Sequence, residues 1–129
     1  MLITTLVNAV STQNASGANT NSTKTSFSAT TTAYAISVSL LGSAQTGNVQ
    51  KPVVVYFYES PFSISAGAAA YTINSPHRLE CTPRQQANST SITQSVAIAA
   101  MGTYLYCWVE MPSITTAGGT LTVNLIELN

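Results

Sequence analysis

Charged residues are scarce in this chain of 129 residues, at 6% of the total against about 25% in an average soluble domain. Aspartate is absent, and the four glutamates balance four lysines and arginines, so the net charge is zero. Proteins that bind nucleic acid contact phosphates mainly through Lys and Arg, so the composition argues against a nucleic-acid partner. A disordered tail is excluded as well, because 45% of the residues are hydrophobic.

Long hydrophobic runs are missing too. The longest, residues 52–58, has the length of a strand and falls far short of the roughly 20 apolar residues of a membrane span. Residues 1–7 carry no basic group before their apolar positions and are interrupted by Thr4 and Thr5, unlike a secretory signal. We therefore expect neither a membrane partner nor export by a classical signal.

Side chains that carry catalytic or metal chemistry are few. The single histidine, His77, lies between Pro76 and Arg78 in a stretch without regular alternation. No nucleophile-elbow pattern occurs anywhere in the chain. His77 and Cys81 are four residues apart, without the paired spacing of structural zinc sites. We predict that the protein is not an enzyme and binds no metal or cofactor. All four glutamates, Glu80 among them, are expected to be solvated. Three of them lie at predicted strand ends: Glu59, Glu110 and Glu127.

Two cysteines, Cys81 and Cys107, permit one disulfide bond. Cys107 lies in the apolar run 104–111, where a free thiol behaves as a small hydrophobic side chain. Two reduced thiols are the favoured expectation, and a bridge between them stays open.

Alternation with a period of two dominates the rest of the chain and predicts β-strands. It runs over residues 34–40, 92–98 and 120–128, whereas 53–58 is apolar on both faces, as in a central strand. Residues 115–119 are typical of a hairpin turn that joins the last two strands. We predict one all-β domain spanning 1–129, a single β-sandwich of jelly-roll or immunoglobulin-like type with about seven to nine short antiparallel strands.

A segment rich in Ser, Thr and Asn, residues 8–26, interrupts this pattern near the N-terminus. These side chains compete with the backbone for hydrogen bonds, which favours loops and edges. The segment is therefore predicted to be an extended arm or loop that becomes ordered against a partner. Its candidate contact residues are Asn14, Asn19, Asn21 and Lys24.

Five aromatic side chains gather on two predicted strands: Tyr56, Tyr58, Tyr104, Tyr106 and Trp108. Core packing or a subunit interface is the favoured interpretation, because alternate positions of two-sided strands must face inward. A platform for stacking sugar rings is the alternative. The charge-poor surface itself favours self-association, since little net charge keeps copies apart.

The layout resembles small β-sandwich virion proteins of tailed bacteriophages, especially capsid decoration (cement) proteins. The similar parts are the opening segment 2–10, the Ser/Thr/Asn-rich arm with residues 25–30 leading into a strand, and the closing segments 102–110 and 120–125.

This resemblance implies a structural virion protein that binds and stabilises a phage capsid, located on the capsid surface and made in the host cytoplasm. The implied partner is the major capsid protein of an assembled shell, and the implied state is a homo-oligomer, with a trimer favoured. A carbohydrate-binding module of the tail or receptor contact is the alternative function.

Overall fold

The computed structural model describes residues 1–11, 21–42, 53–61, 77–81, 89–110 and 119–129. Over these residues the chain is all-β, as the alternation predicts, and contains no helix. The strands are β1 (Leu2–Ser11), β2 (Asn21–Ser26), β3 (Ala33–Gly42), β4 (Val53–Ser60), β5 (His77–Cys81), β6 (Ser89–Gln94), β7 (Ile98–Ala99), β8 (Tyr104–Glu110) and β9 (Gly119–Leu128).

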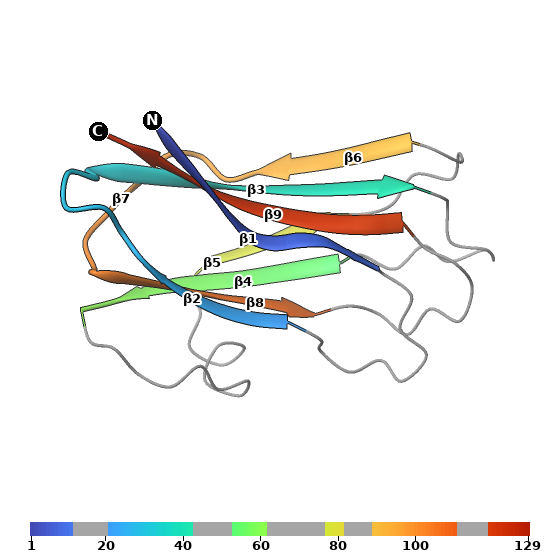
Figure 1. Ribbon diagram of the computed structural model, residues 1–129, viewed down its shortest axis with the longest axis horizontal. Coiled ribbons are helices and arrows are strands. Elements are labelled where there is room, and N and C mark those ends of the chain that lie inside the picture. The colour runs from blue at the N-terminus through green and yellow to red at the C-terminus, as the bar shows by residue number, and fades with distance from the viewer. Residues whose placement is uncertain (12–20, 43–52, 62–76, 82–88, 111–118) are drawn as a thin grey trace.

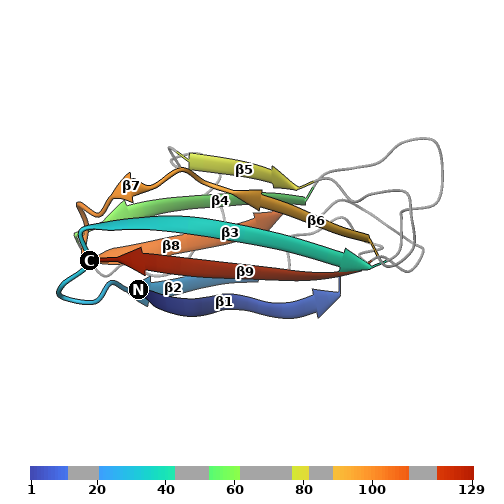
Figure 2. The ribbon, with the colours of Figure 1, turned by 90° about the horizontal axis from the view of Figure 1, so that it is seen from above.

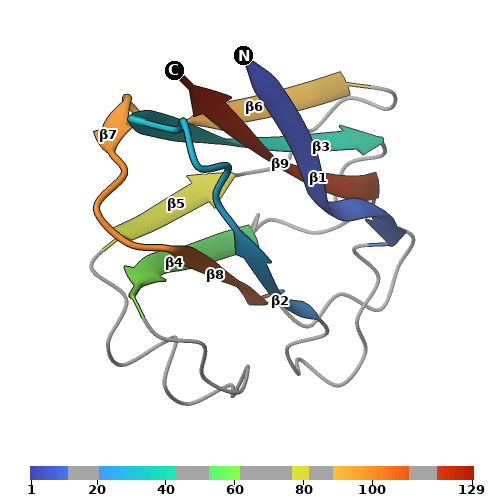
Figure 3. The ribbon, with the colours of Figure 1, turned by 60° about the vertical axis from the view of Figure 1, so that its left-hand side comes forward.

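Two antiparallel sheets lie face to face (Figure 1). Sheet I has the order β1-β9-β3-β6, with β7 also paired to β3, and sheet II has the order β2-β8-β4-β5. The pairs are nested along the chain: β1 with β9, β2 with β8, β3 with β6, and β4 with β5. This nesting brings the two ends of the described chain to the same end of the molecule (Figure 3).

The predicted hairpin of the last two strands is wrong. Strand β8 pairs with β2 and β4 in sheet II, whereas β9 pairs with β1 and β3 in sheet I. Both strands have apolar side chains that must be buried, and crossing between the sheets lets each become a central strand. The turn residues before Gly119 lie outside the described part of the chain.

The core between the sheets is built from the alternate apolar residues of the central strands. Sheet I contributes Ile36 and Val38 from β3 and Leu121, Val123 and Leu125 from β9. Sheet II contributes three residues each from β4 and β8: Val53, Val55, Phe57, Leu105, Cys107 and Val109. Period-two alternation places these side chains on one face of each strand, and burying them is the main favourable term in folding.

The two open sides of the sheet pair are bridged by threonine hydroxyls. Thr23 Oγ1 of β2 donates to the carbonyl oxygen of Leu6 in β1 (3.3 Å). On the opposite side, Thr93 Oγ1 of β6 donates to the carbonyl oxygen of Glu80 in β5 (3.0 Å). Each bond links an edge strand of one sheet to an edge strand of the other.

The predicted arm, residues 8–26, has boundaries that are too wide. Residues 8–11 continue β1 beside β9, and residues 21–26 form β2 beside β8. Of this predicted arm, only residues 12–20, with Asn14 and Asn19, lie outside the described part of the chain. Ser, Thr and Asn are compatible with an edge strand when a neighbouring strand supplies the backbone hydrogen bonds, which composition alone does not reveal.

Glu127 departs from the expectation of a solvated glutamate. It faces the core side of β9 and is only 2% exposed. Its Oε1 accepts hydrogen bonds from the backbone N–H of Ser28 (2.7 Å) and from Thr31 Oγ1 (2.8 Å). A buried carboxylate needs such partners, and here it fixes the connection between β2 and β3.

Cys81 and Cys107 form no disulfide bond and both side chains are buried, as the sequence favours. They lie on β5 and β8, which are separated by β4 in sheet II. Burial raises the pKa of the Cys107 thiol from 9.0 to about 12, because the thiolate would lose its hydration.

Candidate functional site: the aromatic face of sheet II

All five aromatic residues singled out from the sequence lie on the outer side of sheet II. In β8, Leu105, Cys107 and Val109 belong to the inter-sheet core. The alternating residues Tyr104, Tyr106 and Trp108 therefore point the other way. None of the five belongs to the core cluster between the two sheets, although the side chain of Tyr106 is fully buried. Their favoured interpretation, core packing or a subunit interface, stays a prediction.

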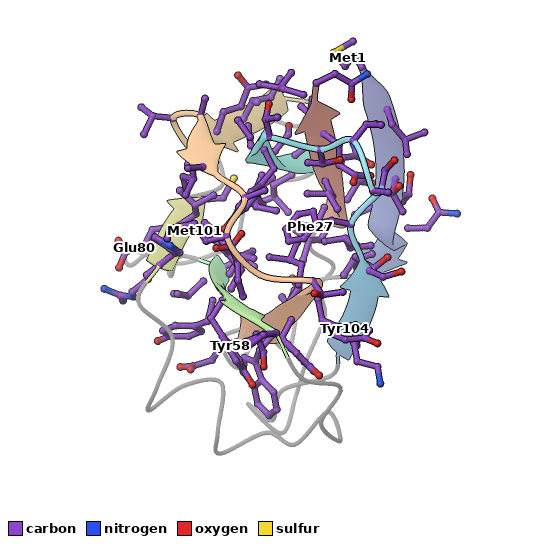
Figure 4. All side chains as sticks on the ribbon, turned by 90° about the vertical axis from the view of Figure 1, so that its left-hand side faces the viewer. Met1, Phe27, Tyr58, Glu80, Met101 and Tyr104 are labelled. Atoms are coloured by element: carbon purple, nitrogen blue, oxygen red, sulfur yellow. The ribbon has the colours of Figure 1, made fainter. Side chains whose placement is uncertain are left out.

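Strand β4 repeats the arrangement beside β8. Its core residues Val55 and Phe57 alternate with Tyr56 and Tyr58. In the register of the two strands Tyr56 stands opposite Trp108, and Tyr58 stands opposite Tyr106. Figure 4 shows Tyr58 and Tyr104 on the side of the molecule away from sheet I. We call the group formed by the four half-buried rings of Tyr56, Tyr58, Tyr104 and Trp108, together with the buried ring of Tyr106, the aromatic face.

Tyr106 is the centre of this face. Its ring stacks on Tyr58 with centroids 5.0 Å apart and an interplanar angle of 14°. Lys24 of β2 is its partner on the other side, and the side chain of Tyr106 is fully buried. Burial raises the pKa of Tyr58, and the neighbouring Tyr106 raises it further. The two stacked rings form one block on the outer side of sheet II.

Cationic groups flank the block on both sides. Lys24 Nζ lies 5.8 Å from the ring centroid of Tyr104, and the guanidinium carbon of Arg78 lies 5.9 Å from that of Tyr56. Arg78 also forms an ion pair with Glu80 at 2.6 Å. Both cation–ring distances are within the range of a favourable cation–π contact.

The positions of the rings limit what they can bind. A sugar stacks on the open face of an aromatic ring, but Tyr58 and Tyr106 each use one face against the other. One face of Tyr104 and one of Tyr56 lie against Lys24 and Arg78. Tyr, Trp and Arg held in fixed positions are the residue types that dominate protein–protein binding energy.

The outer face of sheet I has a different character. Opposite the core residues, β3 presents Ala35, Ser37 and Ser39, and β9 presents Asn124 and Ile126. Among the described residues, no charged side chain lies on this face, whereas sheet II carries Lys24, Arg78, Glu80 and Glu110 on its outer side. The described strands thus give sheet I a neutral outer side and sheet II an aromatic, charged one.

The other candidates from the sequence are dispersed. Asn21 is the first residue of β2, and Lys24 joins the aromatic face through Tyr104. His77 stacks on the core residue Phe57, with centroids 4.9 Å apart. Glu59 accepts a hydrogen bond from the backbone N–H of Met101 (3.2 Å).

Arg78 does not stand out in the sequence, and Glu80 is expected from it only to be solvated. Their spacing of two residues on a short strand indicates a shared face, but their position beside Tyr56 follows from the pairing of β5 with β4. Within the described residues no three His, Cys, Asp or Glu side chains group into a metal site. In the same part of the chain no helix has the length and apolar character to span a membrane.

Comparison with known proteins adds no relative: no family model matches the chain, and no curated protein sequence matches it.

Proposed function

We propose that the protein is a structural, non-catalytic component of a virus particle that binds a protein shell through the aromatic face. The observation that carries this proposal is the placement of Tyr56, Trp108 and Arg78 together on one outer sheet face. Tyr and Trp side chains supply large contact area with little loss of side-chain entropy. The resemblance to capsid decoration proteins supplies the partner, the major capsid protein of a phage shell, and the location, the capsid surface after synthesis in the host cytoplasm.

The finer fold that we propose is a jelly roll. The nested pairs β1–β9, β2–β8, β3–β6 and β4–β5 support it, because winding one long hairpin into two sheets gives this pairing. Eight-stranded jelly rolls of two antiparallel sheets are common in viral capsid proteins, and they also occur in lectins. The same pairing favours the jelly roll over the immunoglobulin-like alternative.

The first test is the copy number of the chain in purified particles of its source virus, measured by quantitative mass spectrometry against the major shell protein. Hundreds of copies per particle are expected for a decoration protein, of which the homotrimer is the form that the resemblance favours. A few copies would indicate a tail or portal protein, and absence from the particle would contradict the proposal.

The second test is binding of the purified chain to isolated shells. The double substitution Tyr56→Ala with Trp108→Ala removes facing aromatic side chains and should weaken binding at least about 30-fold, as expected for interface residues worth about 2 kcal/mol. Ile92→Ala on the opposite sheet is the matched control and should bind normally. Circular dichroism checks that both variants fold. Undiminished binding by the double variant would show that the shell contacts another surface.

A carbohydrate-binding module is the second candidate, since four half-buried rings, Tyr56, Tyr58, Tyr104 and Trp108, lie on an outer sheet face. Trp108 is the single tryptophan, so its fluorescence reports on this face alone. A change in its emission on adding oligosaccharides, but not on adding shells, would favour the module. A change with shells alone would favour the decoration protein.

A further inference from the structure

The N-terminal half of β1 is an open sheet edge. Strand β1 pairs with β9 on one side only, and it forms the margin of sheet I (Figure 2). At Leu6 the other side is closed by the hydroxyl of Thr23, and the register with β9 becomes irregular after Thr5. Residues 2–5 are therefore regular strand with backbone groups directed away from β9 and, among the described residues, no strand beside them.

Large apolar side chains are exposed along this edge. Leu2 is 51% exposed and Ile3 is 55% exposed, next to Met1 at 80%. Because successive side chains of a strand point to opposite faces, Leu2 and Ile3 flank the edge on both sides of the sheet. Consecutive exposed apolar residues on an edge strand are a template for pairing with another strand.

The edges of sheet II differ in a way that bears on the partner. They carry Lys24 on β2 and Arg78 with Glu80 on β5, and charges on an edge strand oppose pairing. Strand β1 has no charged residue between Leu2 and Ser11. A partner strand must match an uncharged, apolar edge, because charged side chains placed against it would lose hydration without compensation.

We propose that β1 binds β1 of a second copy of this chain, in antiparallel pairing about a two-fold axis, so that sheet I continues across both copies. A strand placed against its own copy in this way meets identical unpaired backbone groups and identical apolar side chains, which makes the contact self-complementary. The inference goes beyond the proposed function, because it concerns the chain in solution without any shell.

The contact is short and its affinity is correspondingly low. Four residues per copy, at about 3.4 Å each, give a paired length of about 14 Å. This is well below the surface of a standard stable interface, so a dissociation constant in the range of about 10 μM to 1 mM is expected. A two-fold contact through β1 is a different interface from the three-fold contact of a homotrimer. It can therefore join two trimers as well as two monomers.

The test is sedimentation equilibrium of the purified chain over a concentration range up to about 1 mM, with two matched variants. Ile3→Lys places a charge on the open edge and should weaken dimerisation at least tenfold. Ile92→Lys is the control: this isoleucine is 61% exposed on β6, at the other edge of the same sheet. It should leave dimerisation unchanged. Circular dichroism confirms that both variants fold.

Cross-linking gives an independent measurement. Cysteine introduced in turn at Leu2, Ile3, Thr4 and Thr5 should yield a disulfide-linked dimer for at least one position, because facing Cα atoms of antiparallel strands lie at disulfide distance. Cysteine at Ile92 should not. The native thiols are buried and do not compete.

Three results would overturn the proposal. The first is a chain that stays monomeric throughout the concentration range, and the second is dimerisation that resists Ile3→Lys. The third is association weakened equally by both lysine variants, which would indicate head-to-tail pairing of β1 with β6. None of these results depends on shell binding, so failure here leaves the proposed function to its own tests.

Discussion

Glu127 is the only charged side chain that is buried in the described part of the chain. Two donors from the β2–β3 connection, the Ser28 N–H and the Thr31 hydroxyl, share its Oε1. Glu127→Ala removes both bonds and should lower the free energy of unfolding by about 3 kcal/mol, since bonds to a charged acceptor are worth about 1.5–3 kcal/mol each. Urea denaturation measures the change.

Two further variants serve as controls for this measurement. Glu127→Gln retains an acceptor oxygen and should lose less stability than Glu127→Ala. Glu110→Ala removes an exposed glutamate and should change stability by no more than about 0.5 kcal/mol. Equal effects of the two alanine substitutions would contradict a structural role for Glu127.

Cys107 makes stability depend on alkaline pH. In the folded protein its pKa is about 12, whereas an unfolded thiol titrates near 9.0. Above pH 9 the unfolded state loses a proton that the folded state keeps. The thiol's contribution to the free energy of unfolding is therefore complete below pH 9 and is lost as the pH rises towards 12. The slope is about 1.4 kcal/mol per pH unit for one group.

Urea denaturation in reductant between pH 7.5 and 10.5 tests this dependence. Cys107→Ala should be less stable than the wild type at pH 7.5, because a cavity replaces the thiol, but should lose less stability above pH 9. Burial raises the pKa of Tyr34 too, so some alkaline loss should remain in Cys107→Ala and diminish in Tyr34→Phe. Identical slopes for Cys107→Ala and the wild type would contradict the assignment.

At the scale of the elements, the sequence predicts a strand where apolar alternation coincides with burial. The alternation in residues 34–40 lies in β3, and the apolar run 53–58 lies in β4. Alternation misleads in 92–98, where the strand ends at Gln94 and both Ile92 and Val96 are exposed. There the inward position at the sheet edge belongs to Thr93, whose hydroxyl reaches β5.

Strand β2 could not be predicted from its own residues. Its sequence has no large apolar side chain, and its partner β8 lies about 80 residues further along the chain. The aromatic face is likewise only partly predictable from the sequence. Its residues stand out by type, but whether they face the core or the outside depends on which side of sheet II meets sheet I.

At the scale of the molecule, the two sheets divide the surface into faces of different chemistry. Four ionisable side chains on the outer side of sheet II, Lys24, Arg78, Glu80 and Glu110, sum to zero charge, and Arg78 and Glu80 are already paired. Sheet I presents neutral side chains and the apolar edge of β1. Counted over the described side chains alone, neither surface offers a net charge to an opposite charge on a partner.

Association through either surface should therefore depend little on salt. Raising NaCl from about 0.05 to 0.5 M shortens the Debye length from about 14 to 4 Å and weakens contacts between exposed charges. We expect the dissociation constants for the shell and for the β1 dimer to change less than about threefold, measured by co-sedimentation and by sedimentation equilibrium. Ammonium sulfate should tighten both, because it strengthens apolar burial. A tenfold loss of shell binding in NaCl would instead mean that Lys24 or Arg78 binds a charged group, and that the rings of the aromatic face serve to position those cations.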